Sequence, residues 1–456
     1  MKISVIGGGG FRTPTLHGCL VRVAGAVGID EIALHDPSDK RLARIGAVIE
    51  GLDRERGGAV VPTRTTTSLD DAVDTCGAVL VAIRVGGGEA RVIDEEVPLS
   101  LGVLGQETVG PGGIAFALRT IPVVEAIADV VRDRAPAAWF VNFTNPAGVV
   151  TQAAFEVVGE HAVGICDSPS ALCARVARAV GVRPEELAFD YAGLNHLGWL
   201  LGAEASDGTD VLPGLLRDER RLAVVDEARS FGPERLRALG AIPNEYLLYV
   251  ERAHEVTASF RTEGARGAIV EAQQRAFFRE APADDPVEAL AAWRRARDAR
   301  HATYLAEGRA AAAWDPPLDH EGWRDDVGPG EEGYAAVAAD FLTATSADDP
   351  RRIIVDAPSG GRLDGVGPDE IAELTCEVTR HGVRPLEGRR IPREAAALVE
   401  RVKEAERLTL RAAREGSRHL ALQALATHPV VPDAATAERI LQGYLERHGG
   451  LAGALR

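Results

Sequence analysis

The chain has 456 residues, of which 46% are hydrophobic, and it carries a formal net charge of −17 at pH 7. A chain of this length and composition can bury a large core and is long enough for two or three domains. The acidic excess argues against a nucleic-acid partner, because proteins that bind nucleic acid gather basic residues on one face.

The five cysteines are scattered and lack the dense, regular spacing of a secreted disulfide scaffold, which indicates reduced thiols. No secretion signal opens the sequence, and no apolar stretch is long enough to cross a bilayer. We therefore expect a cytoplasmic protein that contacts neither a membrane nor nucleic acid.

The first half of the chain alternates between short apolar stretches and amphipathic ones. Strands are expected at residues 1–6, 31–35, 78–83, 138–142 and 162–165, and helices at residues 15–26, 38–52, 116–132 and directly after Pro146. Strands that alternate with helices in this way predict a parallel, doubly wound sheet.

After Gly193 this alternation fades, and stretches rich in Ala, Arg and Glu predict long helices, notably at residues 286–308 and 393–426. Residues 328–333 are expected to form a polar, glycine-rich loop. The predicted fold is α/β. A Rossmann-like domain with a doubly wound parallel sheet spans residues 1–192, and a mainly helical (α+β) domain for substrate, metal and oligomer contacts spans residues 193–456.

A glycine-rich turn follows the first expected strand. Gly7 and Gly9 match the first two glycines of a dinucleotide-binding fingerprint, and Gly10, Phe11 and Arg12 lead into the next helix. Such a turn lets the backbone approach a pyrophosphate, whose charge meets free amides at the start of the helix. Arg12 stands where the fingerprint has its third glycine, so a plain tight turn that binds nothing is the alternative.

Asp36 ends the second expected strand, where a carboxylate accepts hydrogen bonds from a ribose and favours NAD over NADP. A cap or turn role is the alternative. Arg84 and Arg91 follow the third expected strand, which would place them at the mouth of the cleft, where guanidinium groups suit phosphates. The alternative is a loop arginine paired with Glu89 or Asp94.

Three further segments place reactive groups near the ends of expected strands, where doubly wound folds bind ligands. Asn145 offers a donor and an acceptor to a sugar hydroxyl, unless it simply caps the following helix. Cys166 and His196 could together hold a divalent metal that keeps open positions for two substrate oxygens. A buried thiol and a core histidine are the alternatives, because the spacing does not require a metal.

Residues 242–249 carry two of the six tyrosines. A tyrosine beside a metal-bound substrate could act as a base if the metal's charge lowered its pKa. Tyr246 and Tyr249 are one helical turn apart, so either could take this role, and a core tyrosine is the alternative. We favour Tyr246.

In this order the segments resemble glycoside hydrolase family four, whose members are NAD- and metal-dependent glycosidases, over residues 1–389. The motifs that carry the resemblance are VIGGG at 5–9, AIRVGG at 82–87, GQETVGPGG at 105–113, NFTNPAG at 142–148 and GLNH at 193–196. FTNPAG and NHLGW are more similar to the 6-phospho-β-glucosidase branch than to the α-acting branches.

The resemblance implies an elimination route that differs from the usual scheme of two carboxylates. NAD first takes a hydride from sugar C3, which acidifies the proton on C2. A base removes that proton while the metal stabilises the enolate, and the leaving group departs from C1. Water then adds and the hydride returns, so NAD is recycled.

The resemblance also implies site residues and partners. The matching positions are Cys166 and His196 as ligands of Mn²⁺ or another divalent transition metal, Tyr246 as base, Asp167 as acid, Asn145 and Arg91 as substrate contacts, and Arg266 as a phosphate-binding arginine. The implied partner is a small-molecule glycoside, with or without a 6-phosphate, and we expect a homodimer or homotetramer.

Departures from the family pattern leave alternatives open. Asp167 follows the cysteine as in α-acting relatives, whereas many β-acting members have Asn there. Residues 328–330 and 333–336 also differ from the pattern, so an unphosphorylated glycoside is a second alternative. A malate- or lactate-type dehydrogenase would share the fold but release NADH, and an NAD-sensing protein would catalyse nothing.

Overall fold

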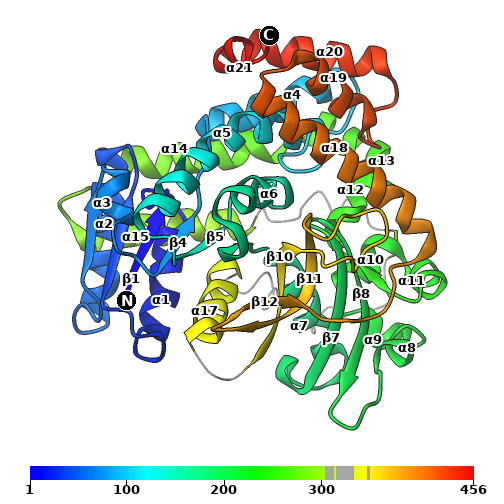
Figure 1. The fold of residues 1–456 in the computed structure, drawn as a ribbon, viewed down its shortest axis with the longest axis horizontal. Coiled ribbons are helices and arrows are strands. Elements are labelled where there is room, and N and C mark those ends of the chain that lie inside the picture. The colour runs from blue at the N-terminus through cyan, green and yellow to red at the C-terminus, as the bar shows by residue number, and fades with distance from the viewer. Residues whose placement is uncertain (303–312, 315–332, 347–349) are drawn as a thin grey trace.

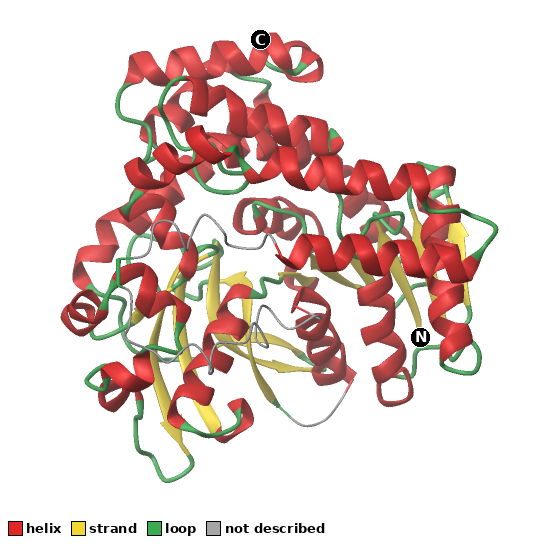
Figure 2. Ribbon diagram, turned by 180° about the vertical axis from the view of Figure 1, so that it is seen from behind, coloured by secondary structure: helices red, strands yellow, loops and turns green. Residues whose placement is uncertain are grey.

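The computed structural model describes residues 1–302, 313–314, 333–346 and 350–456, whose strands join one twelve-stranded sheet surrounded by helices (Figures 1 and 2). The N-terminal half of this sheet is parallel, in the order β3-β2-β1-β4-β5-β6. Its strands are β1 Lys2–Ile6, β2 Glu31–His35, β3 Thr63–Thr66, β4 Ala78–Val81, β5 Trp139–Asn142 and β6 Ala162–Gly164. This order confirms the Rossmann-like prediction and places the ligand crevice where β1 and β4 diverge.

Helices connect these strands. They are α1 Thr13–Val27, α2 Asp39–Glu55, α3 Leu69–Val73, α4 Gly87–Ser100, α5 Pro111–Arg134, α6 Ala147–Val158 and α7 Ser168–Val180, with 3-10 turns η1 Gly159–His161 and η2 Pro184–Glu186. Ser38 caps α2 by accepting a hydrogen bond from the Arg41 amide, and Gly28 ends α1 in the left-handed conformation at φ 76°. The sequence missed β3, α3, α4 and α7, and α5 begins five residues before the predicted start at residue 116.

The second half extends the sheet with antiparallel strands, in the order β6-β10-β11-β7-β8-β9, and β12 pairs with β11. These strands are β7 Leu187–Leu194, β8 Leu197–Ala205, β9 Ile242–Pro243, β10 Arg351–Pro358, β11 Ile371–Thr379 and β12 Gly382–Pro385. The sequence predicted none of them, because β7 and β8 carry no period-two pattern and the partners of β10 in β6 and of β11 in β7 lie far away in the chain. The boundary expected between residues 192 and 193 falls inside β7.

Short helices follow β8, and longer ones cover the sheet. The short elements are α8 Leu212–Leu215, α9 Glu219–Leu222, α10 Asp226–Phe231, α11 Pro233–Leu239, η3 Glu245–Leu247, α12 Leu248–Glu251 and α13 Ala253–Glu263. The longer part comprises α14 Arg266–Glu280, α15 Pro286–Ala302, α17 Gly333–Ser346, η5 Arg393–Ala395, α18 Ala396–Glu415, α19 Arg418–Thr427, α20 Ala434–Arg447 and α21 Gly449–Ala454. Helix α17 packs against α1, α15 against α2, and α18 against α5.

The two long helices predicted in the second half are partly corrected. The helix expected at residues 393–426 is two helices, since Gly416 adopts φ 61° and ends α18. Helix α15 ends at Ala302, and residues 303–308 of its predicted range lie outside the described residues. The same holds for residues 328–332 of the expected loop, whereas Gly333 begins α17.

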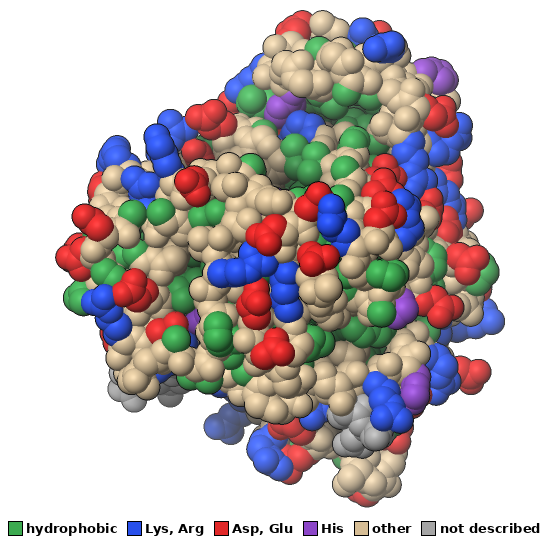
Figure 3. All heavy atoms as spheres, turned by 60° about the vertical axis from the view of Figure 1, so that its left-hand side comes forward, with side chains coloured by type: hydrophobic (Ala, Val, Ile, Leu, Met, Phe, Trp, Pro, Cys, Tyr) green, Lys and Arg blue, Asp and Glu red, His purple; other side chains and the backbone are tan. Residues whose placement is uncertain are grey.

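The surface is mixed in charge. On the face shown in Figure 3, acidic and basic side chains alternate and form no continuous basic area. Across the described ranges, no helix combines the length and apolar character that a membrane crossing requires. This face therefore offers no footprint for a polyanion.

Candidate active site

The glycine-rich turn connects β1 directly to α1. The Gly7 and Gly8 amides donate to the His35 carbonyl at 2.9 and 2.7 Å, and the Gly10 amide donates to the Gly7 carbonyl at 2.8 Å. Gly7 adopts φ 89°, and a Cβ there would lie 2.3 Å from the Ala82 carbonyl oxygen. Only glycine fits this position, and Phe11 and Arg12 then lead into α1, whose first amides can face an anion.

Asp36 lies against this turn. A Cβ on Gly9 would stand 2.8 Å from the Oδ2 atom of Asp36, and the Oδ1 atom accepts from the Ser38 amide at 2.9 Å. The carboxylate therefore shapes the turn after β2 and at the same time faces the glycines. Ser38, not Asp36, is the cap of α2.

Glu107 joins Arg84 and Arg91. Its Oε2 atom lies 2.6 Å from Arg84 Nη2 and 3.1 Å from Arg91 Nη1, while Arg91 Nε donates to Glu95 at 2.7 Å. Burial favours a raised pKa for Glu107, but the two guanidinium groups outweigh it and hold the pKa well below its usual range. Arg91 is thus a buried, structurally fixed cation that pairs with neither Glu89 nor Asp94, the partners that the alternative interpretation named.

Further arginines gather nearby. Arg266 begins α14, and the amide of Gly267 beside it donates at 2.7 Å to Glu95, the partner of Arg91. Arg300 of α15 has its pKa lowered to about 9 by burial and by the positive charges of Arg12, Arg266 and Arg91. Four arginines from four elements therefore meet in one region, which favours an anion there. The sequence missed Arg300 because it stands in an Arg-rich helix without a local signal.

Cys166 and Asp167 follow the end of β6. The buried Cys166 thiol donates to Ser168 Oγ at 3.5 Å, and burial raises its pKa well above the usual value, as do Glu373 and Asp167. Burial also raises the pKa of Asp167, while Arg12 and a hydrogen bond with Tyr334 oppose the rise. Arg12 lies over the Tyr334 ring at 5.2 Å from its centre, so this tyrosine connects the glycine-rich turn to Asp167.

His196 stands in the two-residue hairpin between β7 and β8. It adopts φ 62°, a left-handed conformation that costs free energy for any residue other than glycine. Burial lowers its pKa to about 4, so the ring is neutral at pH 7 and can serve as a ligand. Within the described residues its Nε2 atom has no hydrogen-bond partner. A buried ring nitrogen without a partner is unusual and points to a ligand at this atom.

Tyr246 stacks on the His196 ring, with ring centres 3.8 Å apart and an angle of 5° between the planes. Burial raises its pKa well above 10, and the nearby Glu245 and Cys166 raise it further. Tyr249 instead packs between Tyr246 and Phe260, at 5.5 and 6.4 Å between ring centres. Of the two tyrosines considered as base, Tyr246 is therefore the one in ring contact with His196.

Asn145 is half-buried where β5 leads into α6. The preceding turn is held by Asn142, whose Oδ1 atom accepts from the Thr144 amide at 2.8 Å. Pro146 occupies the cap position of α6, so the interpretation of Asn145 as a helix cap is wrong. The Asn145 side-chain amide therefore does not cap α6.

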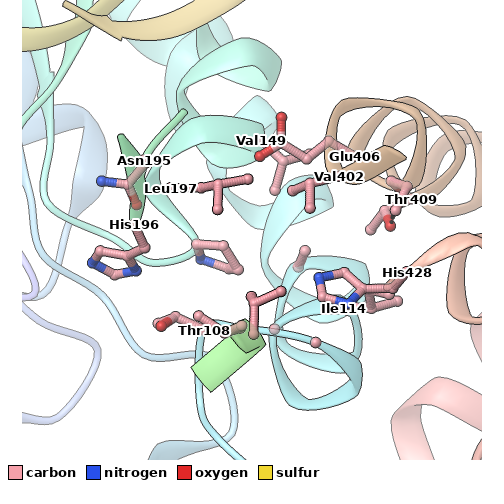
Figure 4. Close-up of a pocket in the computed structure, with 17 residues that line it drawn as sticks. Thr108, Ile114, Val149, Asn195, His196, Leu197, Val402, Glu406, Thr409 and His428 are labelled. Carbon is pink, nitrogen blue, oxygen red and sulfur yellow. Dashed lines mark hydrogen bonds between the residues drawn. The ribbon is translucent and has the colours of Figure 1, made fainter. Parts of the chain in front are cut away.

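A cavity borders the hairpin, between α5, α6 and α18 (Figure 4). Asn195 and His196 line one end of it, and Thr409 and His428 line the opposite end. The wall between these ends is largely apolar. Open space therefore reaches the hairpin that carries the expected metal ligand.

The donors fit a metal held by two protein ligands. In the part of the chain that the structure describes, no group of three or more His, Cys, Asp and Glu residues is arranged around a metal position. The Cys166 thiol and the His196 ring are both buried. Cys166 is close enough to Tyr246 to raise its pKa, and the His196 ring stacks on the Tyr246 ring. A thiolate and an imidazole suit a divalent transition metal, and its remaining positions would stay open for oxygens.

Two models of one protein family together match most of the chain. The model described as family 4 glycosyl hydrolase matches residues 2–182, and the model of the C-terminal domain of that family matches residues 191–431. The chain is 29% identical to a probable 6-phospho-β-glucosidase of Bacillus subtilis, covering 98% of this chain and 96% of the relative. It is 28% identical to 6-phospho-α-glucosidase 1 of Lacticaseibacillus paracasei, in an alignment that covers 96% of this chain and 95% of the relative.

A solved structure is similar over the same extent. The 6-phospho-β-glucosidase of Thermotoga maritima, determined with manganese, NAD⁺ and glucose 6-phosphate, superposes with a TM-score of 0.80 at 27% identity and covers 99% of each chain.

Proposed function

Because the chain belongs to family 4 of the glycosyl hydrolases, we propose that it hydrolyses 6-phosphoglucosides and that the β anomer is its substrate. Membership in this family makes the chain a glycoside hydrolase. The conventional dehydrogenase and the non-catalytic NAD sensor that the sequence left open are therefore set aside. The observation that carries the proposal is His196, whose buried Nε2 atom has no partner among the described residues and whose ring stacks on Tyr246.

The cofactors expected from the sequence, NAD and a divalent cation, are those of the Thermotoga maritima complex. When bound, NAD supplies a reversible hydride acceptor, and the cation supplies positive charge beside the sugar C2 and C3 oxygens. The turn of Gly7, Gly9 and Gly10 would receive the pyrophosphate, and Asp36 the ribose. Cys166 and His196 would hold the cation.

Three side chains would then act on the sugar. Tyr246 would take the C2 proton at its phenolic oxygen, and its raised pKa means that it needs nearby positive charge to do so. Asp167 would deliver a proton to the leaving oxygen, since burial raises its pKa and favours the protonated form. Asn145 would hold a sugar hydroxyl with its amide.

The arginines support a phosphorylated substrate. Arg91, Arg266 and Arg300 carry positive charge from three helices into one region, and Arg12 adds to it. A sugar phosphate and the NAD pyrophosphate are anions that such a region attracts. The β preference rests on the sequence of the hairpin and on the Bacillus subtilis and Thermotoga maritima relatives, while Asp167 favours the α alternative. The cytoplasmic location and the homo-oligomer stay predictions.

The test offers four substrates to the purified protein with NAD, Mn²⁺ and a reductant: p-nitrophenyl β-glucoside 6-phosphate, its α anomer and the two unphosphorylated glucosides. We expect nitrophenol from the phosphorylated β anomer, dependent on both cofactors and without net NADH. Faster release from the α anomer would overturn the β assignment. NADH that accumulates without cleavage would contradict hydrolysis altogether.

A pair of arginine variants on α15 tests the phosphate contact. Arg300→Gln is expected to raise KM for the phosphorylated substrate by roughly tenfold or more, because a guanidinium–phosphate contact is among the stronger hydrogen-bonded pairs. Arg297 lies one helical turn earlier, with its guanidinium over the Trp293 ring, and Arg297→Gln should leave KM unchanged. Equal KM values in both variants would remove Arg300 from the phosphate site.

A further inference from the structure

A chain of hydrogen bonds with a buried centre runs from the His196 hairpin to the turn that carries Tyr246. The Asn195 amide donates at 2.9 Å to Oε1 of Glu373, and the Tyr191 hydroxyl donates at 3.0 Å to Oε2 of the same carboxylate. The Asn244 amide nitrogen in turn donates to the Tyr191 hydroxyl at 3.2 Å. The Oδ1 atom of Asn244 accepts a hydrogen bond from the Tyr246 backbone amide at 3.0 Å.

Every link has a defined direction. A carboxylate accepts both bonds, one on each oxygen, and the Tyr191 hydroxyl donates one bond while accepting another. Glu373 and Tyr191 are each 1% exposed and Asn244 is fully buried, so the two central bonds are shielded from water, whereas the outer bonds at Asn195 and at the Tyr246 amide are part-buried. The network therefore links the hairpin and the Tyr246 turn through side chains, in addition to the pairing of β7, β8 and β9.

The glycines of the hairpin make room for this network. Gly193 and Gly198 face each other across β7 and β8, and a Cβ on Gly198 would stand 2.5 Å from the Tyr191 hydroxyl oxygen. The Gly198 carbonyl also accepts from the Asn244 backbone amide at 2.8 Å. The phenol can cross the hairpin only because no side chain occupies that position.

We propose that Glu373 is a positioning residue that fixes the expected metal ligand His196 and the expected base Tyr246 relative to each other. The inference rests on the proposed function for the roles of those two residues. Glu373 touches neither the sugar nor the cofactor and acts through two arms. One arm holds Asn195, the neighbour of His196, and the other passes through Tyr191 and Asn244 to Tyr246.

The two arms predict different defects. Glu373→Gln keeps one acceptor oxygen, now uncharged, and turns an NH₂ group toward the second donor, so it breaks one arm and weakens the other. Tyr191→Phe keeps the contact of Glu373 with Asn195 and breaks only the arm to Tyr246. A side chain that merely stabilised the fold would lower the melting temperature without separating metal binding from turnover.

The experiment measures Mn²⁺ affinity and turnover separately. Mn²⁺ affinity is read from the electron paramagnetic resonance signal of the free ion, with NAD and glucose 6-phosphate present, and kcat from nitrophenol release. Glu373→Gln is expected to lower both, with the larger loss, about tenfold, in the arm that loses its hydrogen bond to a charged group. Tyr191→Phe is expected to lower kcat by about tenfold and to change Mn²⁺ affinity by less than about twofold.

Two matched variants serve as controls. Glu377→Gln removes a carboxylate from the same strand, where it pairs with Arg384 at the surface at 2.9 Å. Tyr444→Phe removes another buried hydroxyl, which donates to the Asp94 carbonyl at 2.9 Å in the C-terminal helices. Both should keep wild-type Mn²⁺ affinity and kcat.

The outcomes separate this inference from the proposed function. Wild-type Mn²⁺ affinity and kcat in Glu373→Gln would overturn the positioning role. A kcat in Tyr191→Phe equal to that of Tyr444→Phe would overturn the arm to Tyr246, even if Glu373→Gln failed to fold. If the wild-type protein cleaved none of the glycosides, the proposed function would fail, and the Mn²⁺ affinity of Glu373→Gln would still decide the arm to His196.

Discussion

At the scale of single residues, the site depends on side chains that are absent as much as on those that are present. Gly7, Gly9 and Gly198 each stand where a Cβ would collide with backbone, a carboxylate or a phenol. His196 shows the opposite case, since a non-glycine residue is held in the left-handed region that its neighbours impose. Steric constraint at these positions places the chemical groups around them.

Gly9→Ala tests this constraint in the cofactor turn. The new Cβ would lie 2.8 Å from Arg41 Cβ and from Asp36 Oδ2, so the turn and the carboxylate must shift. We expect the Kd for NAD to rise by about tenfold or more and stability to fall by roughly 1–3 kcal/mol. Isothermal titration calorimetry and urea unfolding give the two quantities.

Gly25→Ala is the matched control on α1. Across the described residues nothing lies within 4 Å of a Cβ at this exposed helical position, so alanine should add about 0.5–1 kcal/mol of stability and leave NAD affinity unchanged. NAD binding by Gly9→Ala at wild-type strength would contradict the assigned role of the turn.

At the scale of elements, a buried ionic cluster attaches the C-terminal helices to α4 and α5. Asp94 of α4 is 1% exposed and pairs with Arg119 of α5 through two bonds of 2.8 and 2.6 Å. His448 lies 2.9 Å from the same carboxylate, and Tyr444 donates to the Asp94 carbonyl.

Arg119→Leu should therefore cost about 3–5 kcal/mol, because it leaves a buried carboxylate without its main partner. Arg447→Leu removes an exposed arginine that pairs with Glu96 at 2.6 Å on the same helices, and it should cost only about 0–1 kcal/mol. Urea unfolding of both variants measures the difference. Equal losses would show that the buried cluster contributes no more than a surface ion pair.

At the scale of the whole molecule, the two halves of the chain share one sheet and cover each other. Gly164 of β6 pairs with Asp356 of β10, and α17, α15 and α18 from the second half pack on α1, α2 and α5 (Figure 1). The apolar faces of those N-terminal helices are buried by sequence that lies far along the chain. The N-terminal helices that flank the parallel strands therefore depend on the second half for part of their cover.

A fragment of residues 1–192 tests this dependence. It would end inside β7, expose one edge of β6 and lose the helices that cover α1, α2 and α5. We expect no cooperative thermal transition by circular dichroism and no NAD binding, whereas the full chain shows both. A sharp transition together with NAD binding would identify the N-terminal half as an independent folding unit.

Local pattern predicted the parts of the fold whose interactions are close in sequence. The alternation of apolar strands and helices located β1, β2, β4, β5 and β6 to within about two residues. It missed β7 and β8, because the second half of β7 and nearly all of β8 are buried on both faces, so that neither sequence carries a period of two. It also missed Glu373, which reaches Asn195 across 178 residues.

The sequence by itself determined the Rossmann-like half, the glycine-rich turn with Asp36, and the residue types that suit a metal and a base, because these depend on local period and on side-chain chemistry. Tertiary structure was needed to stack Tyr246 on His196, to bring Arg300 to Arg12, Arg91 and Arg266, and to join two loops through Glu373. Those contacts unite segments far apart in the chain. The antiparallel extension of the sheet brings His196, Tyr246 and Glu373 together, and the packing of α4, α14 and α15 brings the arginines together.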